Sequence, residues 1–260
     1  MFSAVDDQQP ELKHNIRRAQ VKQQFLPPPD KLDFDLPVGY ICLLTDDGSR
    51  LTSEVAQTLK DKGWKVVVLR FSQLATKSSL PEGVEQVMLK NGNDEEIKTQ
   101  LTAIKANYGE IATFIHLHPQ EKAEGLEKVG EFELEKMFDS PETAIIKQVF
   151  LLAKHLKSSL NQAAKLGRSC FLTVTHLDGE LGCSGKNEYE LNPITGGLFG
   201  LTKSLRWEWQ SVFCRAIDLN PDLDITTATQ HILAELHDPN RLIVEVGYST
   251  RARNTLIANI

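Results

Sequence analysis

The turn Thr45, Asp46, Asp47, Gly48, Ser49 stands between an apolar run and a helical pattern, where a phosphate-binding loop is expected. Such a loop uses several glycines, so that backbone N–H groups and the helix N-terminus can face the anion. This turn has one glycine and two carboxylates, and like charges ~4 Å apart repel by roughly 1 kcal/mol in bulk water and by several in a cleft. The pattern favours a structural turn, with Asp47 or Ser49 as helix cap and Gly48 in the bend, over a variant dinucleotide loop.

Arg70 lies near the end of the next apolar run. A cofactor with a free ribose hydroxyl is held there by Asp or Glu, whereas its phosphorylated form tolerates Arg. Taken alone, Arg70 points towards NADPH. An exposed arginine at a strand end is common, however, so the signal is weak.

His116 and His118 are two residues apart in an apolar run, so both side chains are expected on one face of a strand. Two imidazoles in this arrangement can hold a metal ion, and His176 is a candidate third ligand. The alternative is polar capping of the sheet edge, which we favour because no further ligand lies nearby in the sequence. The chain has no G-x-S-x-G, H-E-x-x-H or P-loop motif, which removes the main support for a hydrolase.

Strands that are apolar on both faces alternate with amphipathic helices from residue 37 to residue 260. This order predicts an α/β fold with a doubly wound, mostly parallel, Rossmann-like sheet covered by helices on both sides. Ligands of such folds bind at the carboxyl ends of the strands, where the residues above stand. The predicted strands cover residues 39–45, 64–71, 83–90, 111–119, 168–177, 212–219 and 241–248.

Residues 1–36 are predicted to form a proline-rich linker or tail, with a short helix over residues 13–24 as one option. The net charge of −6, without a concentrated basic face, argues against nucleic-acid binding. No apolar run is long enough for a membrane span and the N-terminus lacks a signal pattern, so a cytoplasmic protein is expected. The four cysteines have no metal-ligand or C-x-x-C spacing and are expected to be structural.

The segments RSCFLTVTHLDGELG and NPITGGLFGLTKSLRWEWQSVFCRAIDLNP resemble the ketoreductase region of modular polyketide synthases, above all of bacterial polyunsaturated (omega-3) fatty acid synthases. LPVGYICLLTDDGSRLT, FIHLHP and ELHDPNRLIVEVGY are similar to the same family. The resemblance runs from about residue 36 to the end. It implies one of two tandem short-chain dehydrogenase-like units: a structural half with a degenerate cofactor site, or a catalytic half that binds NADPH.

The helix phrase GLTKSL sets the register against the short-chain dehydrogenase pattern. Leu191 takes the place of the catalytic tyrosine, Thr195 that of the lysine four residues later, and Asp178 stands near the place of the catalytic serine. Tyr189 does not rescue the site, because Pro193 stands four residues after it. General acid catalysis at a carbonyl needs a positioned donor of tuned pKa, and none of the three roles is filled.

The resemblance therefore implies the structural half, with no cofactor bound by this chain and NADPH in the adjoining catalytic half. Its expected partners are that catalytic half in the same polypeptide and the acyl carrier protein of the synthase, with no nucleic acid and no membrane. Of Trp207 and Trp209, which point to different faces of a helix, one is expected in the core and the other at an interface. The alternatives are an active NADPH-dependent β-ketoacyl reductase with an atypical site, and an interaction domain that binds a carrier protein or a metal.

Overall fold

The computed structural model describes residues 19–74, 79–120, 141–185 and 193–259. Within them, one sheet has the strand order β1-β9-β8-β7-β6-β5-β2-β3-β4. Its strands are β1 (Gln20–Leu26), β2 (Tyr40–Thr45), β3 (Val66–Phe71), β4 (Glu85–Leu89), β5 (Glu110–Leu117), β6 (Cys170–Thr175), β7 (Phe213–Leu219), β8 (Glu245–Tyr248) and β9 (Arg253–Asn259). All pairs from β4 to β8 are parallel, which confirms the predicted doubly wound sheet.

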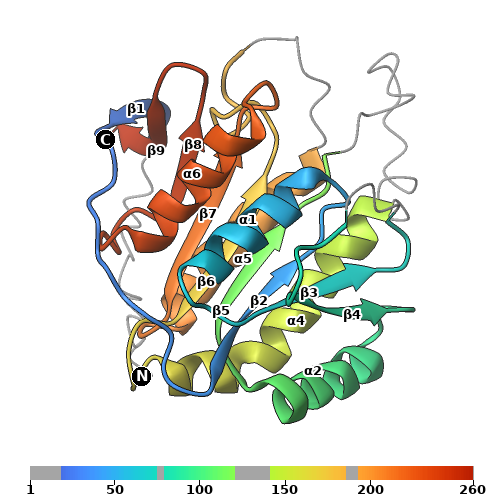
Figure 1. Cartoon of the computed structure of the whole chain (residues 1–260). Helices are drawn as coiled ribbons and strands as arrows, with labels where there is room; N and C mark the ends of the chain where they lie inside the picture. The colour runs from blue at the N-terminus through green and yellow to red at the C-terminus, as the bar shows by residue number, and fades with distance from the viewer. Residues whose placement is uncertain (1–18, 75–78, 121–140, 186–192, 260) are drawn as a thin grey trace, which may run out of the picture.

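Helices cover both faces of the sheet (Figure 1). On one face lie α1 (Arg50–Asp61) and α6 (Ile225–His237), and on the other lie α2 (Asp94–Tyr108), α4 (Pro141–Ala163) and α5 (Gly196–Glu208), the last preceded by the 3-10 turn η1 (Pro193–Thr195). Successive residues of a strand point to opposite faces. In β2, Ile41 and Leu43 therefore join the core beneath α2, α4 and α5, whereas Cys42 and Leu44 join the core beneath α1 and α6.

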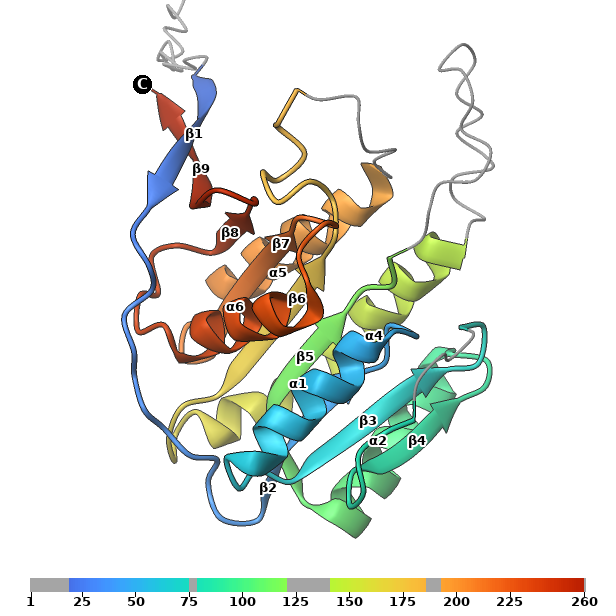
Figure 2. The same ribbon diagram turned by 45° about the horizontal axis from the view of Figure 1, so that its top comes forward.

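The first described segment is a strand rather than part of a linker. Residues 20–26 form β1, which pairs antiparallel with β9, and Figure 2 shows this pair at one end of the sheet. The expected helix over residues 13–24 is therefore wrong where the structure describes it. Local sequence could not reveal the pairing, because the two strands come from opposite ends of the chain.

The segment between β1 and β2 is also folded onto the domain. The ring of Phe34 lies 5.3 Å from that of Trp64 and 5.0 Å from that of His237, measured between centroids. The backbone N–H of Leu32 donates to the carbonyl oxygen of His237 at 2.8 Å. Four prolines stop regular structure here, as expected, but the segment packs against α1 and α6. The predicted division at residue 36 is thus corrected: residues 20–36 belong to the folded unit.

A buried network of charges fastens α6 to the last strands. Arg215 and Arg253 both pair with Glu235, at 3.2 and 2.6 Å, and both pair with Asp238, at 3.0 and 2.8 Å. Tyr248 donates a further hydrogen bond to Glu235 at 2.7 Å. The side chains of Arg215 and Glu235 are fully buried, so each charge depends on its partners. None of the described helices is long and apolar enough to cross a bilayer.

Candidate functional site

The strand order reverses between β2 and β5, and the crevice outside the carboxyl ends of these strands is the usual ligand site of a doubly wound sheet. The turn 45–49 follows β2, and His116 and His118 stand at the end of β5 and just after it. His176 and Asp178 follow β6. The structure thus brings most of the predicted residues to one edge of the sheet.

Asp46 closes the turn after β2 from within. Its Oδ1 accepts a hydrogen bond from the backbone N–H of Gly48 at 2.9 Å. Its Oδ2 lies 2.6 Å from Nε of Arg70 on β3. The carboxylate of Asp46 is almost fully buried. Arg70, which could have faced a ribose phosphate, is instead an ion-pair partner of this turn.

Asp47 organises the start of α1. It accepts hydrogen bonds from the backbone N–H of Ser49 at 3.0 Å, from the Ser49 hydroxyl at 2.6 Å and from the Thr52 hydroxyl at 2.6 Å. Ser49 is the N-cap, and its hydroxyl accepts from the backbone N–H of Leu51 at 3.0 Å. Ser49 is one of the two caps that the sequence predicted, and Gly48 makes the bend in the left-handed region at φ 79°.

The hydrogen-bond donors that would face a pyrophosphate are therefore occupied by the protein itself. The N–H groups of Gly48, Ser49 and Leu51 all donate to side-chain oxygens of this short segment. Two buried carboxylates replace the anion that a helix N-terminus favours. A bound phosphate would have to displace them.

His116 and His118 lie on one face, as expected, and are bonded to the protein. Nδ1 of His116 is 2.8 Å from the hydroxyl of Thr45, and its Nε2 is 3.3 Å from Nδ1 of His118. Burial lowers the pKa of His116 well below its ordinary value, and the neighbouring His118 lowers it further. Among the described residues, no group of three or more His, Cys, Asp or Glu side chains could hold a metal ion, so His176 does not complete a site with this pair.

Asp178, near the place of a catalytic serine, organises its own loop. Its carboxylate accepts from the backbone N–H groups of Glu180 at 2.7 Å, Gly182 at 2.8 Å and Ser184 at 3.1 Å. Burial opposes ionisation, but these hydrogen bonds outweigh it and lower the pKa of Asp178. A carboxylate held in this way acts as an internal anchor, as Asp47 does.

A second carboxylate, which the sequence did not single out, fastens the same loop to the sheet. Asp218 on β7 accepts from the N–H groups of Leu177 at 2.7 Å and Leu181 at 2.9 Å. Burial raises the pKa of Asp218 to about 7 in spite of these bonds, and the neighbouring Asp178 adds to the rise. Gly179 touches the backbone of Tyr248, so a side chain does not fit there. An aspartate between apolar residues near the end of a strand was the signal that could have identified this role.

Of the positions matched to the catalytic tyrosine and lysine, the structure describes only the second. Leu191 lies outside the described residues. Thr195 is buried at the start of α5 and makes no capping hydrogen bond with its side chain. Lys203, more than two helical turns further along α5, pairs with Glu245 at 2.7 Å. Thr195 has no ammonium group, and the ammonium group of Lys203 is paired with a carboxylate.

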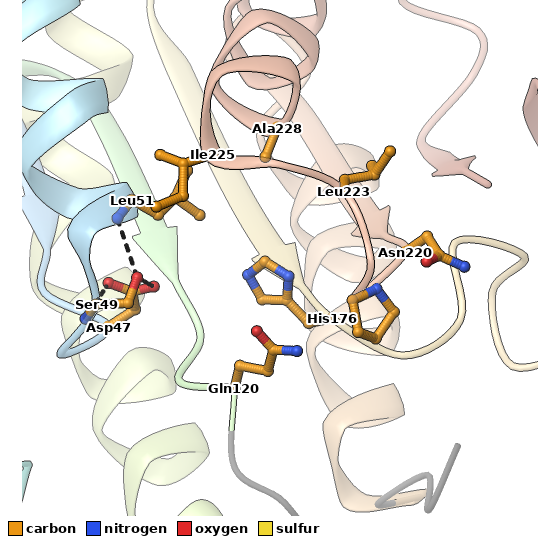
Figure 3. Close-up of a pocket in the computed structure, with 10 residues that line it drawn as sticks. Asp47, Ser49, Leu51, Gln120, His176, Asn220, Leu223, Ile225 and Ala228 are labelled. Carbon is orange, nitrogen blue, oxygen red and sulfur yellow. Dashed lines mark hydrogen bonds between the residues drawn. The ribbon is translucent and has the colours of Figure 1, made fainter. Parts of the chain in front are cut away.

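One pocket lies at this edge (Figure 3). The ends of four strands contribute to it: Asp47 follows β2, Gln120 follows β5, His176 follows β6 and Asn220 follows β7. The remaining lining residues are Ser49, Leu51, Pro221, Leu223, Ile225 and Ala228. Burial lowers the pKa of His176, and the charge of Asp47 opposes this shift.

No family model matches the chain. One of the subunits of the polyunsaturated fatty acid synthase of Thraustochytrium sp. is 26% identical over 235 residues, which cover 88% of this chain. The chain spans only 8% of the length of that relative. This similarity agrees with the family expected from the sequence.

Solved structures share the fold at low sequence identity. A multidomain structure with adenylation, ketoreductase and pseudo Asub domains, from a keto acid-selecting NRPS module, matches 94% of this chain and 19% of its own at 13% identity and a TM-score of 0.62. A variant of the actinorhodin polyketide ketoreductase, solved with NADPH, matches 78% of this chain and 79% of its own at 14% identity and a TM-score of 0.53. Short-chain dehydrogenases are among the other matches. The chain is therefore similar in sequence to part of a polyunsaturated fatty acid synthase, and its fold is the ketoreductase-like fold of the short-chain dehydrogenases.

Proposed function

We propose that this chain is a non-catalytic domain that braces the NADPH-dependent β-ketoacyl reductase half of a polyketide or polyunsaturated fatty acid synthase. The observation that carries the proposal is the occupation of the loop N–H groups by Asp46, Asp47 and Asp178. An active relative would offer these loops to cofactor and substrate. Here each loop binds its own carboxylate.

An exposed aromatic surface supports the bracing role. Trp207 on α5 is 81% exposed and Phe150 on α4 is 57% exposed, whereas Trp209 is buried. Lys157, seven residues after Phe150 and so on the same side of α4, reaches Glu208 of α5 at 3.9 Å. The two aromatic side chains are thus exposed on neighbouring helices of the same layer. Aromatic residues are enriched at the centres of protein interfaces.

Titration of the purified chain with NADPH, monitored by nicotinamide fluorescence, tests whether the chain binds the cofactor. We expect no saturable signal at micromolar concentrations. Saturable binding in that range would overturn the proposal in favour of an active reductase. A chain joined to a catalytic half of the same synthase is the positive control, and it is expected to bind.

A double variant tests whether the two carboxylates prevent NADPH binding. Asp46→Gly with Asp47→Gly frees the loop amides, and any gain in NADPH affinity over the parent is the expected direction. The matched control is Glu54→Gln, which changes an exposed charge on the same helix. If the control gains as much as the double variant, general charge rather than loop occupation governs binding.

A further inference from the structure

The pocket beside α1 has a role that bracing does not explain. Its cavity volume is about 60 Å³. At ~10–15 Å³ for each water-sized group, it holds roughly four to six such groups. A dinucleotide is many times larger. Size alone therefore selects a small molecule, or one end of a longer molecule that enters from the solvent.

One polar atom in the pocket is left without a partner. Nε2 of His176 is buried and makes no hydrogen bond with any described residue, although the residue as a whole is partly exposed. Figure 3 shows its ring in the space between the start of α1 and the segment that carries Asn220 and Leu223. Burial lowers the pKa of His176, which leaves the imidazole neutral at pH 7. A neutral imidazole nitrogen can accept or donate one hydrogen bond.

The charges around this nitrogen disfavour anions. The carboxylate of Asp47 lines the pocket, and the N–H groups of Ser49 and Leu51 at the start of α1 are already bonded. An attraction for cations is weakened as well, because three hydrogen bonds and the N-terminus of α1 stabilise the charge of Asp47. The positive end of the helix, which usually recruits phosphate, already uses the N–H groups of Ser49 and Leu51 for side chains of the turn.

The wall opposite the imidazole is apolar. Leu51 from α1, Leu223 from the segment before α6, and Ile225 and Ala228 from the first turn of α6 face the same space. The other half of the lining is polar, with Gln120 and Asn220 beside His176. In a small-molecule site such polar groups orient the ligand, and the apolar wall supplies contact area. The pocket therefore joins neutral hydrogen-bonding groups, His176 among them, to an apolar wall.

We propose that this pocket binds a small uncharged ligand of the primary amide or alcohol class, with its polar end at His176 and its alkyl end against Leu223 and Ile225. Unlike a nucleotide site, the pocket does not favour an anionic ligand. It goes beyond the bracing role and does not depend on it.

Proton NMR of the imidazole Cε1–H of His176 tests the proposal on the full chain. The chain has seven histidines, and the resonance is assigned by its absence from His176→Phe. Butyramide is the probe, and butyrate, butylamine and inorganic pyrophosphate are the charged comparisons. We expect a saturable shift with butyramide and an affinity at least fivefold weaker for each charged compound.

Two results overturn the site: no saturable shift with butyramide, or binding of any charged compound as tight as that of butyramide. Ala228→Leu is a second variant that fills the pocket and leaves the imidazole in place. It is expected to abolish the butyramide shift while the His176 resonance remains, which also covers the case that His176→Phe does not fold. The two proposals fail separately: NADPH binding would contradict the proposed function, whereas only the butyramide titration decides whether the pocket binds an uncharged ligand.

Discussion

The Oδ1 atom of Asp46 accepts a hydrogen bond from the backbone N–H of Gly48 at 2.9 Å. In a nucleotide-binding loop, such an amide faces the ligand. Here the acceptor comes from two residues earlier in the same turn. The turn therefore supplies a carboxylate of its own where a ligand phosphate would be bound, and the neighbouring Asp47 does the same for Ser49.

Asp47→Ala removes the acceptor of three hydrogen bonds at the start of α1. We expect the free energy of unfolding to fall by about 1–3 kcal/mol, because a partly buried N–H and two hydroxyls lose their partner. Urea denaturation measures the change. Glu54→Gln on the same helix is exposed and should stay within about 0.5 kcal/mol of the parent. Equal effects of the two substitutions would contradict the role given to Asp47.

Asp218 predicts a specific dependence of stability on pH. Its pKa in the folded chain is about 7, above the ordinary 3.8, so the folded state holds a proton that the unfolded state releases. The stabilisation is complete below about pH 3.8 and is lost as the pH rises to about 7, at up to about 1.4 kcal/mol per pH unit.

Asp218→Asn should remove this slope, although it also lowers stability because an amide NH₂ cannot accept from both loop N–H groups. Urea midpoints of parent and variant, compared at several values between pH 4 and pH 7, measure the difference. The readout is the slope and not the absolute stability. Parallel curves for the two proteins would show that Asp218 does not titrate in this window.

Glu235→Gln tests the buried charge network. The substitution leaves the guanidinium groups of Arg215 and Arg253 with one carboxylate, that of Asp238, between them. Breaking a buried ion pair by removing one partner costs about 3–5 kcal/mol. Chemical denaturation measures it, with Glu208→Gln as control, since Glu208 is exposed and its ion pair with Lys157 is long. A cost below about 1 kcal/mol for Glu235→Gln would mean that the network does not hold α6 in place.

The two tryptophans of α5 should separate stability from association. Trp209→Ala deletes a buried ring and is expected to lower the free energy of unfolding by about 3–5 kcal/mol. Trp207→Ala deletes an exposed ring and should change stability by less than about 0.5 kcal/mol. If Trp207 anchors the proposed interface, its loss weakens binding of the separately purified catalytic half by about 2 kcal/mol, or roughly 30-fold. Calorimetric titration of the two proteins measures that affinity, and unchanged binding would remove Trp207 from the interface.

Local patterns in the sequence determined most of the fold. The apolar strands and amphipathic helices appear in the predicted order, since periodicity follows directly from which face of an element is buried. The capped turn at Asp47 and Ser49 followed from the same local logic, because a cap and its amides lie within a few residues of each other. The contrast between Trp207 and Trp209 was expected, but the sequence could not say which ring is buried.

Contacts between distant residues were decided only by the tertiary structure. The pairing of β1 with β9 joins the two ends of the described chain, and no local pattern in residues 20–26 specifies a partner. Arg70 reaches Asp46 across neighbouring strands, and Asp218 holds a loop that begins some forty residues earlier. Sequence identifies which groups carry charge or donors. Only the fold determines which of them meet, because burial makes each partner necessary and the sheet order sets which strand ends are neighbours.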